Sequence, residues 1–362
     1  MPVSLKDVAE RAGVSIKTVS NVVNDHPHVT PATRARVQQA IDALGYRPNP
    51  TARHLRRGRT GIIALAVPEL ANPYFAELAE AVIDAAGEHE YTVLLDRTGG
   101  RREQEVLASQ GFRTRVIDGI ILSPFELQDA DLAGRSDEVP LVLLGEREYD
   151  APYDHIAIDN VAAARAAVRH LLDLGRTRIA YVGADTDSAN RPAELRLAGW
   201  RAELTAAGVP APDSLVVRGK GWGREGGARA MARLLDSGVR PDAVFAFNDL
   251  IAIGVLRALH ERGLRVPEDV AVVGFDDIAE GRFGAVSLTT VSPDKGAIAR
   301  LAVASVLGAL AGGSGESKGS GRRDLAPGFR LVERESTVGR GEAGRPGVAG
   351  VRDQFGGGAG GS

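Results

Sequence analysis

Residues 13–24 read GVSIKTVSNVVN, and this stretch decides the fold of the N-terminal part of the chain. Ser15 is a good helix N-cap, and the apolar residues behind it recur at helical spacing: Ile16, Val19, Val22 and Val23. The residues between them are short or hydrogen-bonding, and none is Glu, the usual residue of a solvated helix face: Lys17, Thr18, Ser20 and Asn21. The pattern predicts a short helix whose polar face contacts another molecule.

Two further helices are predicted around this one. An apolar stripe over residues 5–9 leads toward Gly13, which suits a helix C-terminus. Thr30 and Pro31 open a third helix with an N-cap and a first-turn proline, and Gly45 ends it. A helix, a tight turn containing glycine and a second helix form the helix-turn-helix pattern. The second helix is then the one presented to the major groove of DNA.

The charge of the chain is unevenly distributed. Residues 1–60 hold ten basic and four acidic residues, a formal charge of +6, so the remainder of a chain of net charge −3 carries −9. This asymmetry predicts that the small basic end meets a polyanion. The absence of Cys excludes disulfides, thiolate catalysis and cysteine zinc sites. Because the chain has no apolar N-terminal segment and no apolar run near ~18 residues, we expect a cytoplasmic protein without membrane contact.

From Gly61 the pattern changes to short apolar runs separated by helix-length segments. Such runs are typical of parallel strands buried on both faces, and their number favours two α/β lobes. The nine runs lie at 61–67, 91–96, 116–123, 140–145, 155–159, 178–183, 214–219, 243–249 and 270–277. After a further strand and helix over 288–310, we expect a flexible insert at 311–328, a last strand within 329–340, and a disordered Gly-rich tail.

Several of these stretches together resemble the lac-repressor (LacI/GalR) family of bacterial transcription factors. They include SLKDVAERAGVSIKTVSNVVN at 4–24, HIAIDNVAAARAAVRHLLDLG at 155–175 and VPEDVAVVGFDD at 266–277. The resemblance implies an α/β fold with a helix-turn-helix headpiece and a two-lobed effector domain like periplasmic sugar-binding proteins. It divides the chain into a headpiece (1–47), a hinge helix and linker (48–60), an effector-binding and dimerisation domain (61–340) and a tail (341–362).

The function implied by the resemblance is that of a sequence-specific transcriptional regulator. It is expected to be a repressor that binds a palindromic operator as a homodimer and is controlled allosterically by a small molecule, a carbohydrate or related metabolite. No cofactor, metal or catalytic activity is expected. The alternatives from other classes are a sugar-binding transport component, which the basic headpiece disfavours, and an NAD-dependent enzyme.

The second helix carries the candidate DNA contacts. Lys17 and Asn21 are four residues apart and share a face, where Lys can donate to guanine and Asn can pair with adenine, while Ile16 suits a thymine methyl group. By resemblance these three occupy base-reading positions, and Thr18 and Ser20 lie where hydroxyls bond phosphates. The alternative is a three-helix module that binds protein, with its polar face solvated.

A second DNA contact is expected in the hinge segment, residues 49–58 (NPTARHLRRG). Its length is too short for a stable isolated helix, so we expect it to fold only when two copies meet on DNA. Leu55 stands among arginines, which suits a wedge inserted at a minor-groove base step, and it matches the family's intercalating leucine. The alternative is a plain basic linker.

The candidate effector contacts follow the apolar runs, because ligands of open α/β lobes bind beyond the carboxyl ends of the strands. Aromatic rings with Arg, Asn and Asp suit a small polyhydroxylated or heterocyclic ligand. These positions also match the family's effector contacts: Tyr74, Phe75, Arg196, Trp222, Asn248 and Asp276.

Each of these residues has an alternative role. Tyr74 or Phe75 suits the hydrophobic core equally well, and Arg196 and Asp276 are also able to pair with each other. Asp159 and Asn160 suit a helix N-cap as well as a ligand contact. The weaker candidates, which do not map securely onto the family, are Asp96, Arg97, Glu146 and Arg147.

Three short motifs do not carry a function. GWGREG at 221–226 has the spacing of a dinucleotide loop, but Trp222 gives the turn too much bulk. GESKG at 315–319 has the spacing of a hydrolase nucleophile motif, but no strand precedes it. His26 and His28 have no third metal ligand nearby in the sequence, so a solvated turn is expected there.

Overall fold

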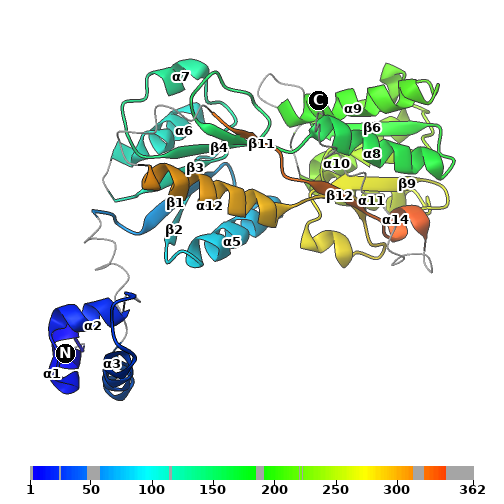
Figure 1. Ribbon diagram of the computed structural model, residues 1–362. Helices are drawn as coiled ribbons and strands as arrows, with labels where there is room; N and C mark the ends of the chain where they lie inside the picture. Colours follow the sequence, from blue (N-terminus) through cyan, green and yellow to red (C-terminus); the bar gives the residue numbers. More distant parts are fainter. Residues whose placement is uncertain are drawn as a thin grey trace, which may run out of the picture. The chain divides into compact units, whose positions relative to one another are not determined.

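The computed structural model describes residues 3–23, 26–46, 58–113, 116–184, 191–219, 221, 223–312 and 322–339. The chain divides into two compact units, residues 1–61 and residues 62–362 (Figure 1). Leu55, Trp222 and the Gly-rich tail lie outside the described residues.

The first unit contains three helices around a small apolar core. They are α1 (Leu5–Ala12), α2 (Ile16–Val23) and α3 (Pro31–Leu44). Gly13 ends α1 with a φ of 62°, a left-handed conformation that favours glycine, and Thr30 caps α3 with its hydroxyl. Val8, Val19 and Val37 are fully buried between the helices. The helix-turn-helix prediction and its helix ends are confirmed.

The second unit contains two six-stranded sheets, one in each of two lobes. The N-lobe sheet has the strand order β11-β5-β4-β3-β1-β2, and the C-lobe sheet has the order β12-β10-β9-β8-β6-β7. Strand neighbours are parallel except for the antiparallel pair β10 and β12. All nine predicted apolar runs form strands, and the two-lobed α/β fold is confirmed.

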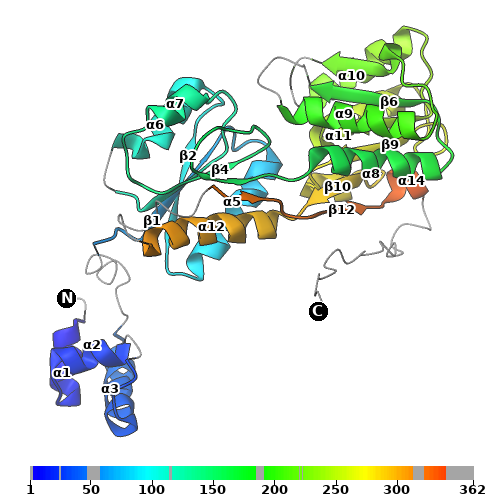
Figure 2. The ribbon, with the colours of Figure 1, turned by 45° about the horizontal axis from the view of Figure 1, so that its top comes forward.

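The N-lobe takes its elements from both ends of the unit. Its strands are β1 (Ile62–Val67), β2 (Thr92–Arg97), β3 (Gly119–Leu122), β4 (Leu141–Leu144), β5 (Asp154–Ile156) and β11 (Asp324–Leu325). Its helices are α5 (Pro73–Gly87), α6 (Arg102–Ser109), η1 (Gly111–Arg113), α7 (Asp129–Ala133) and α12 (Lys295–Ala311). Helix α12 lies beside α5 in both views (Figures 1 and 2) and packs on β3. There a Cβ on Gly119 would overlap the Val306 side chain, so this position requires glycine.

The C-lobe has the same architecture. Its strands are β6 (Ile179–Ala184), β7 (Val216–Gly219), β8 (Ala243–Ala246), β9 (Ala271–Phe275), β10 (Thr289–Pro293) and β12 (Phe329–Val332). Its helices are α8 (Asn160–Asp173), α9 (Arg191–Ala206), η2 (Asp213–Leu215), α10 (Arg224–Asp236), α11 (Asp249–Glu261), η3 (Ala279–Arg282) and α14 (Glu335–Val338). The fully buried side chains of Trp200, Phe245 and Phe275 lie at its core.

Three connections join the lobes, and Figure 2 shows them passing from one sheet to the other. They are residues 157–159 between β5 and α8, residue 294 between β10 and α12, and residues 326–328 between β11 and β12. The Ala157 N–H donates to the Leu325 carbonyl at 3.1 Å, and the Asp294 N–H donates to the Gly328 carbonyl at 3.0 Å. The third connection is therefore hydrogen-bonded to the second, and the strand that leads into it, β11, is hydrogen-bonded to the first.

Three sequence-based predictions about the second unit were wrong in detail. Strand β2 is a partly exposed edge strand rather than one buried on both faces, with Leu94 and Leu95 about two-fifths exposed. Within the stretch expected to be a flexible insert, Asp324–Leu325 pairs with β5 and completes the N-lobe sheet. The last predicted strand ends at Val332 and is followed by helix α14.

Candidate functional site

Helix α2 exposes the face on which DNA contacts were predicted. It buries Val19 and Val22 against the other helices, while Ile16 is 49% exposed. Lys17 is exposed, and the other three candidates are half-buried: Thr18, Ser20 and Asn21.

The N-terminus of α2 is held by Ser15, as predicted. The Thr18 N–H donates to the Ser15 hydroxyl at 3.1 Å, and the two hydroxyl oxygens lie 2.9 Å apart. This cap satisfies an N–H group that the helix itself leaves without an acceptor. The first turn, with Ile16 and Lys17, is therefore fixed on the surface of the unit.

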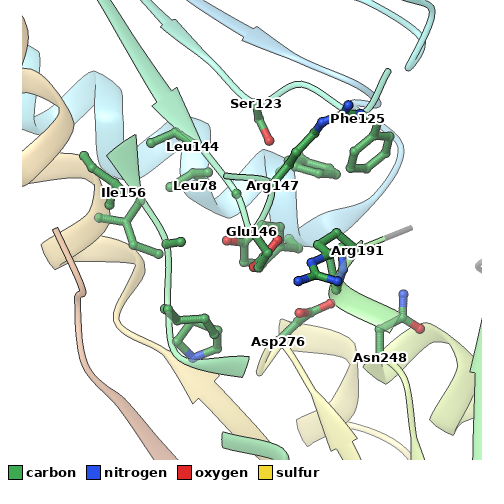
Figure 3. Close-up of a pocket in the computed structure, with 18 of the residues that line it drawn as sticks. Leu78, Ser123, Phe125, Leu144, Glu146, Arg147, Ile156, Arg191, Asn248 and Asp276 are labelled. Carbon is green, nitrogen blue, oxygen red and sulfur yellow. The ribbon is translucent and has the colours of Figure 1, made fainter. Parts of the chain in front are cut away.

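The second unit has a cleft where the carboxyl ends of strands from both lobes meet. The space amounts to about 950 Å³ including its opening to solvent. The N-lobe contributes residues after β1, β3 and β4, and the C-lobe contributes residues from α9 and after β8 and β9. Figure 3 shows Glu146 of the N-lobe facing the same space as Asp276 and Asn248 of the C-lobe.

Arg196 is the central cation of the cleft and is 6% exposed. Its Nε donates to the Asn160 side-chain oxygen at 2.7 Å, and its Nη1 donates to the Phe247 carbonyl at 2.6 Å. The guanidinium carbon lies 3.4 Å from the centre of the Phe275 ring and 4.7 Å from that of Phe247. Hydrogen bonds and aromatic faces together hold the guanidinium in one orientation.

Asn160 connects Arg196 to the other lobe. Its side-chain nitrogen donates to a Glu146 carboxylate oxygen at 2.9 Å, while its oxygen accepts from Arg196. The neighbouring Asp159 is the N-cap of α8 and accepts from the Ala162 N–H at 2.8 Å. The sequence left two roles open for Asp159 and Asn160, a helix N-cap or a ligand contact. In the structure Asp159 caps the helix, and Asn160 links the lobes.

Asp276 lies on a strained loop after β9. The φ angles of Asp276 and Asp277 are 113° and 50°, values that residues with a side chain rarely adopt. Asp249 holds the loop by accepting from the Ile278 N–H at 2.9 Å and from the Thr290 hydroxyl at 2.6 Å. Strained backbone that is held in this way clusters at functional sites.

The carboxylate of Asp276 is an open acceptor. Asp276 is 8% exposed, and among the described residues no side chain donates a hydrogen bond to its carboxylate or forms an ion pair with it. Burial raises the pKa of Asp276 to about 7, the cations Arg196 and Lys295 oppose this shift, and Glu146 adds to it. The sequence analysis gave an ion pair between Arg196 and Asp276 as the alternative to ligand contact. The described residues contain no such ion pair.

Aromatic side chains form the N-lobe wall of the cleft. The rings of Tyr74 and Phe75 meet edge to face with centroids 5.2 Å apart, and Phe75 meets Phe125 at 6.4 Å. Phe75 is 8% exposed and belongs both to the core and to the cleft lining, whereas Tyr74 is half-buried. Asn72, which caps α5, accepts from the Tyr74 N–H at 3.1 Å.

The loop that carries Phe125 is held by a buried carboxylate on α6. Glu105 is fully buried, and its two oxygens accept from the backbone N–H groups of Phe125, Glu126 and Leu127, each at 2.8 Å. Burial raises the pKa of Glu105, and these three hydrogen bonds oppose the increase. Three charge-assisted bonds to consecutive N–H groups define the path of this loop.

The cleft brings together most of the predicted effector contacts. Those lining it are Tyr74, Phe75, Arg196, Asn248 and Asp276, with Glu146 and Arg147 from the weaker set. The Asn248 oxygen accepts from the Ile251 N–H at 2.8 Å and so also caps α11. Asp96 and Arg97, at the end of edge strand β2, are absent from the lining as described.

Several lining residues were missed by the sequence analysis, among them Ser123, Phe125 and Arg191. Ser123 and Phe125 stand at the end of the apolar run 116–123, where the rule that selected Tyr74 also applies. Arg191 is the first residue of helix α9 and follows no apolar run directly, so the rule that selected Tyr74 does not indicate it.

The described ranges contain neither a membrane-crossing helix nor a cluster of metal-ligand side chains. No helix there is long and apolar enough to cross a membrane. The same residues contain no group of three or more His, Asp or Glu side chains arranged to hold a metal ion.

Both ends of the chain match proteins of the same kind, bacterial regulators with a periplasmic binding protein-like domain. Residues 4–49 match the family model "Bacterial regulatory proteins, lacI family", and residues 168–337 match a periplasmic binding protein-like domain. The ribose operon repressor of Escherichia coli K12 is 35% identical over 302 residues, which cover 83% of this chain and 91% of that protein.

Solved structures give the same result. A LacI-family transcriptional regulator from Sanguibacter keddieii is 49% identical with a TM-score of 0.71, covering 78% of this chain and 100% of that one. The lac repressor dimer bound to operator and an anti-inducer is 31% identical with a TM-score of 0.71, covering 93% of this chain and 99% of that one.

Proposed function

The chain belongs to the lacI family of bacterial regulatory proteins, and we propose a mechanism for its control. It is accordingly a DNA-binding transcriptional repressor rather than an enzyme. A sugar binds in the cleft between the lobes of the second unit and changes the affinity of the first unit for its operator. The ribose operon repressor, its relative, supports a sugar as the effector class. Because its target is DNA, we place the protein in the cytoplasm.

The observation that carries this proposal is the composition of the cleft. Arg196 and Asn248 supply donors, Asp276 and Glu146 supply acceptors, and Phe125 is one of the rings on which the apolar face of a sugar can stack. The two lobes supply different members of this set and are joined by three short connections. A ligand that contacts both lobes therefore favours one relative orientation of them, which is the differential affinity that allosteric control requires.

We propose that α2 reads the operator through Ile16, Lys17 and Asn21, while Thr18 and Ser20 bond phosphates. The exposure of Ile16 and Lys17 supports this assignment. Leu55 is proposed to insert at a minor-groove step of the operator. That role rests on the sequence alone.

Repressors of this family act as dimers, and we propose that exposed apolar side chains of the second unit mark the contact. Phe283 is 85% exposed beside a groove lined by Leu256 and Val286 of the C-lobe. On the N-lobe, Ile83 of α5 and Leu94 of β2 are each 43% exposed. Apolar groups of this size are generally exposed in numbers only where a partner covers them. A Phe283→Asp variant that stayed dimeric in analytical ultracentrifugation would contradict the C-lobe part.

The control mechanism is tested by separating effector response from DNA binding. Sugars are screened by thermal shift, and an operator is selected from random duplexes with the purified repressor. Arg196→Lys and Asp276→Asn should bind the operator normally and lose the response to the sugar. Arg201→Lys, on the same helix α9 but outside the cleft, is the matched control. Loss of operator binding and sugar response together, with normal circular dichroism, would show that Arg196 and Asp276 are structural.

A further inference from the structure

The cations of the cleft are already bound to the protein. Arg196 donates from Nε to Asn160 and from Nη1 to the Phe247 carbonyl. Arginine holds a phosphate or carboxylate best through paired hydrogen bonds from two of its nitrogens, and every such pair includes Nε or Nη1. Arg196 therefore keeps one N–H group on Nη1 and two on Nη2, but its Nε–Nη2 edge is not free for an anion, because Asn160 occupies Nε.

The two other arginines of the lining are also engaged. Arg147 Nη2 donates to the Gln128 side-chain oxygen at 2.8 Å, and its guanidinium carbon lies 5.5 Å from the centre of the Tyr149 ring. In Figure 3 the Arg147 side chain runs alongside Phe125, away from Asp276. Arg191 forms an ion pair with Glu194 at 3.0 Å.

The cation near Asp276 outside the lining is neutralised in the same way. The Lys295 ammonium lies 2.5 Å from a Glu77 carboxylate oxygen and donates to the Asp277 carbonyl at 3.2 Å. The other Glu77 oxygen accepts from the Ala279 N–H at 2.9 Å. Lys295 therefore has protein partners of its own, although it still opposes the rise in the pKa of Asp276.

The carboxylates, by contrast, keep open acceptor positions toward the cleft. Glu146 receives one hydrogen bond from Asn160 on one oxygen, and Asp276 receives none from a side chain in the described part of the chain. Glu146 and Asp276 are close enough for the first to raise the pKa of the second. A ligand between them must supply donors, and a negatively charged ligand group would be placed in a partly desolvated site beside two carboxylates.

We propose that Glu146 and Asp276 make the cleft selective for uncharged, hydroxyl-rich effectors and exclude their phosphorylated or carboxylated derivatives. This inference rests on the proposed function and narrows its effector class. Hydroxyl groups donate to the two carboxylates and accept from the remaining Arg196 N–H groups. A phosphate is repelled by both carboxylates, and the arginines that would bind it already donate to other groups of the protein: Asn160, Phe247, Gln128 and Glu194.

The test compares matched pairs of probes by isothermal titration calorimetry at pH 8, above the pKa of Asp276. The pairs are D-ribose and D-ribose 5-phosphate, D-glucose and D-glucose 6-phosphate, D-galactose and D-galacturonate, and adenosine and adenosine monophosphate. In each pair that binds, the neutral member should bind at least ~10-fold more tightly. Glu146→Gln should reduce that ratio by about tenfold, because it removes one repelling charge and keeps a hydrogen-bonding group of the same size. Glu148→Gln, an exposed glutamate two residues away and outside the lining, should leave it unchanged.

The outcomes distinguish this inference from the proposed function. A phosphorylated sugar that binds as tightly as its parent overturns the charge selection and leaves a carbohydrate effector in place. Adenosine binding without any sugar binding contradicts the sugar assignment and supports the charge selection. Equal ratios in Glu146→Gln and Glu148→Gln overturn the role of Glu146. No binding by any probe contradicts both.

Discussion

Replacing Glu105 by Gln tests whether the aromatic wall of the cleft is positioned from outside the cleft. In the variant, the amide oxygen can still accept from Glu126 and Leu127, but the amide nitrogen then faces the Phe125 N–H. One buried N–H group loses its acceptor, at a cost of about 1–3 kcal/mol, and two charge-assisted bonds become neutral ones. Because burial disfavours the Glu105 carboxylate, its removal offsets part of this loss. We expect a net loss of about 1–3 kcal/mol in the free energy of unfolding.

The loss should be concentrated at Phe125, so binding should weaken as well. If the displaced Phe125 ring loses about 1 kcal/mol of its contact free energy with the sugar, the Kd of the sugar identified by screening rises roughly fivefold. Urea unfolding followed by circular dichroism gives the stability, and calorimetry gives the Kd. Glu103→Gln, on the exposed side of the same helix, is the control. In the background of Phe125→Leu, Glu105→Gln should have a smaller effect on the Kd, because the two changes act on one contact.

Two results would refute this reasoning. If Glu105→Gln were no less stable than Glu103→Gln, the three hydrogen bonds would not contribute to folding as described. If the variant were less stable but bound the sugar with the same Kd in both backgrounds, Glu105 would support the N-lobe without positioning Phe125.

Three further predictions concern the DNA-binding helix, the pH response and the packing of α12. Lys17→Ala or Asn21→Ala should cost about 1–3 kcal/mol and relax base preference at one position per half-site, whereas uniform weakening on all duplexes in a gel-shift series would exclude base reading. Since the pKa of Asp276 is raised to about 7, the folded protein holds a proton between about pH 4 and 7 that the unfolded chain has lost, so this group's contribution to stability falls as pH rises across that window. Sugar hydroxyls favour the ionised carboxylate, so the Kd of the sugar should fall about tenfold from pH 6 to 8, and Asp276→Asn should remove this dependence in calorimetry. Gly119→Ala should destabilise by about 1–3 kcal/mol in urea unfolding because the new methyl group overlaps Val306, and Val306→Ala in the same chain should restore part of the loss.

The features of this molecule that could be predicted are those determined by residues close together in the sequence. Gly13 and Thr30 mark helix ends through their own backbone and side-chain chemistry. Each helix end can therefore be predicted from a single residue. Arg196 and Asp276 were identified as cleft residues because parallel strands bring their carboxyl ends to one edge.

The parts that were not predictable depend on contacts between distant segments. Asn160 links Arg196 with Glu146 only after both lobes have formed, and nothing in its sequence neighbours indicates that role. Glu105 holds a loop some twenty positions further along the chain, from a helix that contributes nothing to the cleft lining as described. Strand β11 is two residues long, and its pairing with β5 rather than its composition makes it a strand.

The strand order of the two sheets also has a consequence for synthesis on the ribosome. Each lobe takes its outermost strand, β11 or β12, from residues 324–332, so neither sheet is complete until this segment has left the exit tunnel. The three-helix unit, by contrast, contains only contacts within the first sixty or so residues and is translated first. At about 5–20 residues per second, a nascent chain spends on the order of 15–60 s with the DNA-binding unit made and the effector unit unfinished. During that interval its basic end is available to DNA without any means of responding to an effector.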